Sequence, residues 1–68
     1  MELIVNGREH ALSDGSTIAA LVRELGAPED GRGVAVAVEG EVVPRSRWPE
    51  TELSPGARVE VLTAVQGG

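Results

Sequence analysis

The stretch Ser16-Thr17-Ile18-Ala19-Ala20-Leu21-Val22-Arg23-Glu24-Leu25-Gly26 decides the fold, because it has the periodicity of an amphipathic helix. Its apolar side chains recur at helical spacing and form one stripe, made of Ile18, Leu21, Val22 and Leu25. Ser16 or Thr17 can cap the first turn, and Gly26 ends the helix. A single helix must bury its stripe against other elements. We therefore predict that the rest of the chain forms one sheet, which this helix crosses.

The segment before this helix has the alternating pattern of a β-hairpin. Residues 1–5 and 8–12 flank Asn6-Gly7, a dipeptide typical of a two-residue turn in which both positions take positive φ. This turn fixes the register, so that His10 lies opposite Leu3 on the inner face of the sheet. We expect His10 to lie beneath the edge of the helix, without a catalytic role.

The segment after the helix predicts three more strands. They are expected at residues 34–38, 42–43 and 58–63, with Gly40-Glu41 turning the chain between the first two. Residues 45–53 have no regular pattern beyond a possible helical turn, and the aromatic Trp48 within them is expected to cover one end of the core.

The last strand alternates between its two faces. Its inward residues are predicted to be Val59, Val61 and Thr63, and its outward residues Arg58, Glu60 and Leu62. With one helix between two hairpin-like pairs, the first and last strands should be central and parallel. The predicted fold is α+β, a β-grasp with a mixed four- to five-stranded sheet and one helix packed across one face. Residues 1–63 form the domain, and residues 64–68 a flexible C-terminal tail.

Composition excludes several classes of function. The 68 residues suffice for one small domain, and they contain no cysteine and a single histidine, which leaves no pattern for a metal site or a thiolate nucleophile. The net charge of −5 and the single aromatic residue disfavour nucleic acid. No apolar run approaches the ~20 residues of a membrane span, and no signal peptide is apparent. We expect a cytoplasmic, monomeric protein that binds no cofactor, membrane or nucleic acid.

The C-terminal residues have a different character from the domain. After Thr63 the chain continues as Ala64-Val65-Gln66-Gly67-Gly68, which offers nothing to a core. Two terminal glycines lack Cβ atoms, so they can enter a narrow channel and leave the carboxylate sterically open. We expect these five residues to enter the active sites of partner enzymes.

This combination of fold and tail resembles the ubiquitin superfamily and, within it, the ThiS family of sulfur carriers of thiamin biosynthesis. The similarity extends over the whole chain. Its narrowest motifs are the end Thr63-Ala64-Val65-Gln66-Gly67-Gly68 and the internal stretch Val42-Val43-Pro44-Arg45-Ser46-Arg47-Trp48. The Gly-Gly end is shared by the superfamily, whereas Ala-Val-Gln-Gly-Gly and Val-Pro-Arg-x-x-Trp point to ThiS.

The resemblance implies a protein co-substrate and not an enzyme. An adenylating enzyme of the ubiquitin-activating type (ThiF) would use ATP and Mg²⁺ to convert the Gly68 carboxylate into an acyl-adenylate. A sulfur donor such as a protein persulfide would displace AMP and leave a thiocarboxylate on Gly68. Thiazole synthase (ThiG) would then take the sulfur. The site residue is therefore Gly68, with ATP and Mg²⁺ used by the partner.

A docking face for these enzymes can also be predicted. The residues expected to point outward from the sheet beside the tail are Ile4, Ala35, Ala37 and Leu62. Such residues can equally be scattered surface aliphatics. Acidic side chains would surround them and favour a basic partner, namely Glu2, Glu9, Glu39, Glu41 and Glu60.

Two questions stay open from the sequence. The small subunit of molybdopterin synthase and a ubiquitin-like protein modifier share the fold and the tail, so the pathway follows from the resemblance alone. The chain also contains no lysine. A carrier of an activated acyl group benefits from having no amine to attack it, but codon usage is the simpler explanation of a chain rich in alanine, glycine, valine and arginine.

Overall fold

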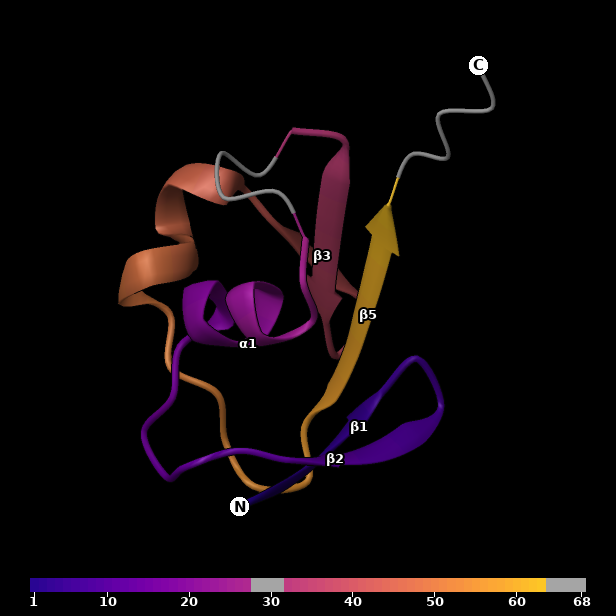
Figure 1. The fold of residues 1–68 in the computed structure, drawn as a ribbon, viewed down its shortest axis with the longest axis vertical. Coiled ribbons are helices and arrows are strands. Elements are labelled where there is room, and N and C mark those ends of the chain that lie inside the picture. Colours follow the sequence, from indigo (N-terminus) through magenta and orange to yellow (C-terminus); the bar gives the residue numbers. More distant parts are fainter. Residues whose placement is uncertain (28–31, 64–68) are drawn as a thin grey trace.

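A computed structural model describes residues 1–27 and 32–63. It shows a five-stranded mixed sheet with one α-helix across one face (Figure 1). The elements are β1 (Glu2–Val5), β2 (Arg8–Ala11), α1 (Ile18–Glu24), β3 (Val34–Val38), β4 (Glu41–Val43), the 3₁₀-helix η1 (Arg45–Glu50) and β5 (Arg58–Thr63).

The strand order is β2-β1-β5-β3-β4, which places the first and last strands side by side in the middle of the sheet. They run parallel, and the other neighbours are antiparallel. This is the predicted β-grasp.

The first hairpin has the predicted turn and register. Asn6 and Gly7 have φ values of 51° and 80°, as a type I′ turn requires. Leu3 pairs with His10, as expected. The His10 ring is half-buried under the helix edge, with Nε2 3.4 Å from Oε1 of Glu24 on α1.

The second hairpin turns one residue earlier than predicted. Its turn residues are Glu39 and Gly40, with φ values of 50° and 83°, and β4 already begins at Glu41. A type I′ turn takes glycine most readily at its second position, as in the first hairpin. Gly40 therefore occupies the second position of the turn, and Glu39 must accept the strained first one.

The ends of α1 are capped by its own sequence. Of the two candidate caps, Thr17 is the one used: its Oγ1 accepts a hydrogen bond of 3.2 Å from the Ala20 N–H. At the other end Gly26 has a φ of 81°, and the Ala27 N–H donates to the Val22 carbonyl at 3.3 Å. This is the Schellman arrangement, in which glycine allows the chain to leave the helix.

Leu25 does not belong to the buried stripe. It is the C-cap residue and is 41% exposed, whereas Ile18, Leu21 and Val22 are buried. The periodicity is correct, but the helix ends at Glu24 and the chain turns away before a further turn of helix could cover Leu25.

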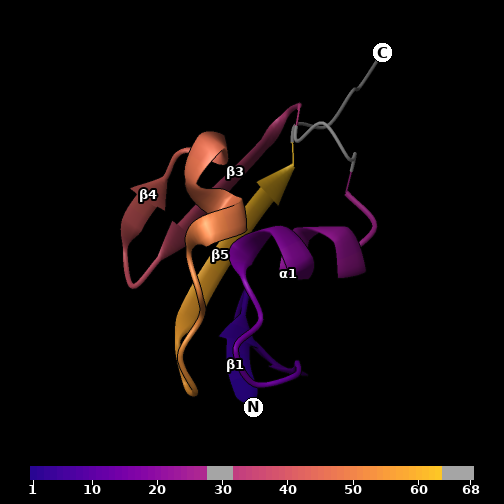
Figure 2. The same cartoon turned by 90° about the vertical axis from the view of Figure 1, so that its left-hand side faces the viewer.

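The core lies between the sheet and the two helices. Its fully buried large side chains are Leu3, Ile18, Leu21, Val36 and Val59. Residues 45–50 form a 3₁₀-helix, η1, which lies beside α1 on the same side of the sheet (Figure 2). Trp48 is 5% exposed there, and its Nε1 donates a 2.9 Å hydrogen bond to the Val43 carbonyl. Trp48 thus covers one end of the core, as predicted, and its only polar group has a partner.

Asn6 connects the hairpin to β5 as well as forming the turn. Its Oδ1 accepts from the Val61 N–H at 2.8 Å, and its Nδ2 donates to the Val61 carbonyl at 3.1 Å. The Asn6 backbone N–H donates to the Val59 carbonyl at 2.9 Å. The side-chain amide therefore takes the place of a β1 peptide group where β1 has turned away. It provides hydrogen-bond partners for the N–H and carbonyl of Val61 on the central strand β5.

Leu21→Ala tests the helix–sheet core. Leu21 is 0% exposed, so the substitution opens a cavity and should lower the free energy of unfolding by about 2–5 kcal/mol. Leu25→Ala is the matched control on the same helix and should change it by less than about 1 kcal/mol. Denaturant titrations of both variants measure the difference. Equal losses for the two would mean that the core assignment of α1 is wrong.

Two substitutions at Asn6 separate its side-chain bonds from its turn conformation. Asn6→Gly keeps the positive φ and loses both bonds to Val61, which should destabilise the fold by about 1–2 kcal/mol. Asn6→Ala should lose about 1 kcal/mol more, because alanine is strained at a φ of 51°. Thermal melts of both proteins provide the comparison. A glycine variant as stable as the parent would show that the amide contributes nothing.

Candidate functional site

The predicted reactive residues, Ala64, Val65, Gln66, Gly67 and Gly68, lie outside the described residues. The structure shows the position of Thr63, the residue that directly precedes them in the chain. Thr63 is the last residue of β5 and pairs with Val34 at the start of β3. The base of the tail therefore lies at the end of a central strand whose position is set by the sheet.

The alternation of β5 is as predicted, with one qualification. Val59 and Val61 are 1% and 7% exposed, and Leu62 on the opposite face is 65% exposed. Thr63 follows the inward alternation but is exposed. It faces a hollow of about 320 Å³ beside Leu25, Gly26 and Ala27, so the end of α1 does not cover it.

Three of the four residues predicted for the docking face lie together. Leu62 pairs with Ala35 across β5 and β3, and Ala37 is the next outward residue of β3. Val42 of β4 pairs with Ala37 and is 74% exposed. We call this set, Ala35, Ala37, Val42 and Leu62, the outer patch. A hollow of about 440 Å³ next to it is lined by Leu62, Ala35 and Thr63, among others, so the patch reaches the base of the tail.

Sequence reasoning did not place Val42 on the docking face, although the alternation of strand residues indicates it. Val43 packs against the core, and strand alternation then directs Val42 outward. Two adjacent valines before a proline predict a short strand but do not by themselves show which of the two faces inward. The pairing with Ala37 is what joins Val42 to the outer patch.

Ile4 does not lie beside the tail. It points outward and is half-buried, but its partners in register are Arg58 on β5 and Glu9 on β2. Arg58 is the first residue of β5, at the end of the strand opposite Thr63. Because β1 is parallel to β5 and pairs only with its first half, Ile4 lies at the end of β5 that is opposite the tail. Its neighbours across the sheet there are the charged residues Arg58 and Glu9.

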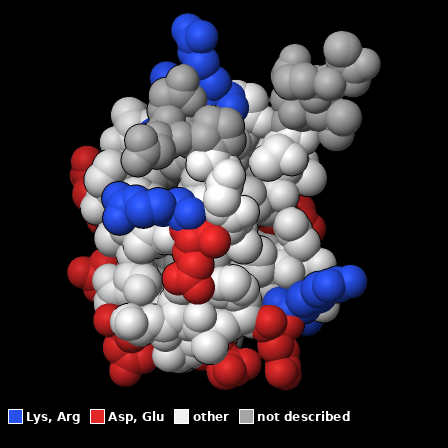
Figure 3. All heavy atoms as spheres, in the orientation of Figure 1, with Lys and Arg blue, Asp and Glu red and all other residues white. Residues whose placement is uncertain are grey.

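The acidic residues predicted to surround the docking face are all exposed, but they do not all share a face. Glu60 pairs with Ala37 and borders the outer patch. Glu41 pairs with Val38, so it lies on the helix side of the sheet. Glu39 Oε2 accepts a 2.8 Å hydrogen bond from the Arg58 N–H. In Figure 3, acidic side chains gather at the end of the molecule where the N-terminus lies, away from the end of β5.

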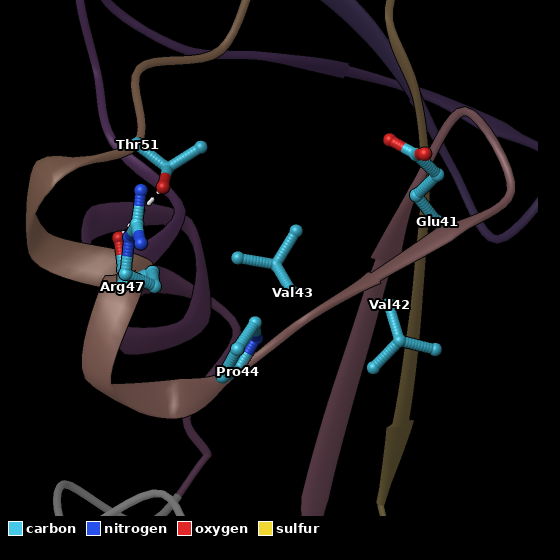
Figure 4. A pocket seen from close by; sticks show the side chains of 6 residues that line it. All are labelled: Glu41, Val42, Val43, Pro44, Arg47 and Thr51. Atoms are coloured by element: carbon cyan, nitrogen blue, oxygen red, sulfur yellow. Dashed lines mark hydrogen bonds between the residues drawn. The ribbon is translucent and has the colours of Figure 1, made fainter.

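The internal stretch from Val42 to Trp48 has a structural explanation. The residues around Pro44 line a hollow of about 480 Å³ between β4 and η1, with Glu41 and Arg47 on opposite sides (Figure 4). Thr51 Oγ1 donates to the Arg47 carbonyl at 2.6 Å. Trp48 Nε1 donates a hydrogen bond to the Val43 carbonyl. The valine, proline and tryptophan of the motif thus fix the path of η1 over the core.

Within residues 1–27 and 32–63, the His, Asp and Glu side chains form no group of three or more that could hold a metal ion. None of the helices in these ranges has the length and apolar character that a membrane span requires.

The sequence model of the ThiS family matches residues 1–68. The chain belongs to the ThiS family. Two solved structures of the thiamine biosynthesis protein ThiS from Geobacter metallireducens have the same fold. The crystal structure is 28% identical, with a TM-score of 0.81 and full coverage of both chains. The NMR structure is also 28% identical, has a TM-score of 0.84, and matches 100% of this chain and 88% of its own.

Part of a longer protein is also similar to this chain. A thiazole synthase of Paramagnetospirillum magneticum is 37% identical over 68 residues, which is 100% of this chain and 20% of that protein. The ThiS-family chain thus spans about a fifth of the length of this curated relative.

Proposed function

We propose that this chain is a sulfur carrier of thiamin biosynthesis, with the Gly68 carboxylate as the group that carries the sulfur. The observation that supports it most is the family match, which spans residues 1–68 and so includes Gly67-Gly68. In this role the chain is a protein co-substrate: it presents its C-terminus to enzymes that supply the catalytic groups.

The chemistry follows from the carboxylate. Its leaving group would be oxide, so it must first be activated. An adenylating enzyme of the ubiquitin-activating type, using ATP and Mg²⁺, would form an acyl-adenylate at Gly68. The terminal sulfur of a persulfide donor would then displace AMP and form an acyl disulfide. A thiol would reduce the S–S bond of this acyl disulfide, forming a new disulfide with the donor's sulfur and leaving a thiocarboxylate on the chain. The chain itself would supply neither acid nor base, only a reachable end on a folded support.

A thiazole synthase is the sulfur acceptor that we propose. The relative in which a domain like this one occupies 20% of the length carries that name. Joining two proteins in one polypeptide raises their effective concentration to about the millimolar range, which favours pairs that act together. The same pairing would bring Gly68 of this chain to the acceptor's active site.

The outer patch is the docking surface that we propose for these enzymes. Leu62 and Val42 are 65% and 74% exposed, and the patch borders the base of the tail. An enzyme that grips this face holds the domain at a short, fixed distance from the point where the tail begins. Glu60 at its border favours a partner with basic side chains nearby.

Intact mass spectrometry tests the chemistry at Gly68. Incubation with the adenylating enzyme, ATP, Mg²⁺ and a sulfur source should raise the mass of the chain by the difference between sulfur and oxygen. Fragment ions should place the sulfur on Gly68. Added sulfur at any other residue would contradict the mechanism.

Deletion of Gly68 separates the carrier role from folding. The variant should melt as the parent does but support no thiazole formation, because the described domain ends at Thr63.

Conjugates joined to lysines of other proteins, in place of a thiocarboxylate, would favour a ubiquitin-like modifier. Sulfur transfer to molybdopterin synthase and not to thiazole synthase would favour the molybdopterin pathway.

Leu62→Glu tests the docking surface. It places a charge within the outer patch and should weaken binding to the adenylating enzyme or to thiazole synthase by about tenfold or more. Stability should change by no more than about 0.5 kcal/mol, because Leu62 is 65% exposed. Leu25→Glu is the control, an exposed leucine changed in the same way at the end of α1. Binding is measured by calorimetry; equal weakening in the two variants would place the docking surface elsewhere.

A further inference from the structure

The basic side chains of this chain, apart from the single histidine, are all of one kind. The six basic side chains are arginines and none is lysine. A guanidinium stays protonated and is a poor nucleophile, whereas a lysine amine attacks activated acyl groups readily. The α-amine of Met1 is therefore the one primary amine of the 68-residue chain.

The Met1 amine is held by two interactions. Its ammonium donates to the Leu12 carbonyl at 2.6 Å, in a partly buried bond, and lies 3.1 Å from Oδ1 of Asp14. The Met1 side chain is 1% exposed and anchors the residue against the core. This amine must therefore leave the Leu12 carbonyl and the Asp14 carboxylate before it can attack a carbonyl carbon.

The Met1 amine also lies at the far end of the molecule from the tail. Ile4 pairs with Arg58 on the parallel strand β5, Met1 precedes Ile4, and Thr63 ends β5. At ~3.3 Å per residue, the roughly eight residue steps from the level of Met1 to that of Thr63 span about 26 Å. Residues 64–68 extend by at most about 17–18 Å. Figure 1 shows the N-terminus and the end of β5 on opposite sides of the fold.

We propose that the folded chain contains no amine that its own activated carboxyl group can reach. This rests on the proposed function, in which Gly68 becomes an acyl-adenylate. Attack by an amine would form a C–N bond and break the C–O bond to AMP, and the amine proton would go to solvent. The resulting amide would remove the carrier from use permanently. Without a reachable amine, the acyl group persists until an external nucleophile, such as a persulfide sulfur, attacks it.

The same arrangement prevents the chain from acting as an acceptor. A second copy could in principle be joined through its Met1 amine, but Leu12 and Asp14 hold that amine. The chain is therefore suited to receive sulfur and unsuited to form polymers of itself, in contrast to a modifier with accessible lysines.

A thioester of the full chain tests this without any partner enzyme. Cleavage from an intein by a small thiol gives a Gly68 thioester, whose fate is followed by intact mass at mildly alkaline pH. The parent should only hydrolyse. Arg32→Lys keeps the charge and places an amine near the tail, because Val34, two residues on, pairs with Thr63. It should form an internal amide and lose its thioester about tenfold faster than the parent.

Ser54→Lys is the matched control at the other end of β5. Residue 54 lies in the turn before this strand, where the Gly56 N–H donates to the Glu2 carbonyl, so a lysine there is far from Thr63. Its thioester should decay within about twofold of the parent rate. An internal amide in the folded parent, or an Arg32→Lys thioester that is no less stable than the parent, would overturn the proposal.

Acylation by a succinimidyl ester tests the restraint on Met1. The folded parent should react about tenfold more slowly than the chain in denaturant, and Asp14→Asn should recover part of the difference. Equal rates for the folded and denatured parent would contradict the proposed restraint. Neither experiment uses sulfur transfer, so a failure here is distinct from a failure of the proposed function.

Discussion

The fold depends on the two-sided pairing of β5. On one side, β5 and the residue before it accept hydrogen bonds from β1 and the turn residue after it: the Ile4 N–H donates to the Ala57 carbonyl and the Asn6 N–H to the Val59 carbonyl, both at 2.9 Å. On the other side it pairs with β3 along its length, from Val59 to Thr63. The inward valines of the same strand are buried under the helix. One strand thus connects the N-terminal hairpin, the C-terminal hairpin and the core.

The same constraint bears on how a small domain could support the proposed reactive tail. A segment that leaves from an edge strand or a loop would share the mobility of that element. Here the tail begins where a central strand ends, so the domain can be gripped on its outer patch while the base of the tail stays in a known place. The proposed docking surface and the proposed reactive residues are then separate in the molecule. The docking surface lies on β3, β4 and β5, and the reactive residues follow Thr63.

Asn6 and Glu39 show how the hairpins are joined to β5 by side chains as well as by strands. The Asn6 amide bonds both backbone groups of Val61, and the Glu39 carboxylate accepts from the Arg58 N–H at 2.8 Å. Each is the first residue of a two-residue turn and has a positive φ. Turn residues therefore satisfy β5 backbone groups at its first residue, Arg58, and at Val61, beyond the residues that pair with β1.

The sequence by itself determined the elements and their faces wherever a local pattern was strong. Helical spacing located α1, Asn6-Gly7 set the first register, and alternation assigned the two faces of β5, because these signals depend on neighbours in the chain. Only the tertiary structure decided what lies beside what. It separated Ile4 from Leu62, added Val42 to the outer patch, left Leu25 exposed, and placed Met1 far from the tail. These facts depend on which strands pair and in what direction, and pairing joins residues too far apart in the chain for any local pattern to specify.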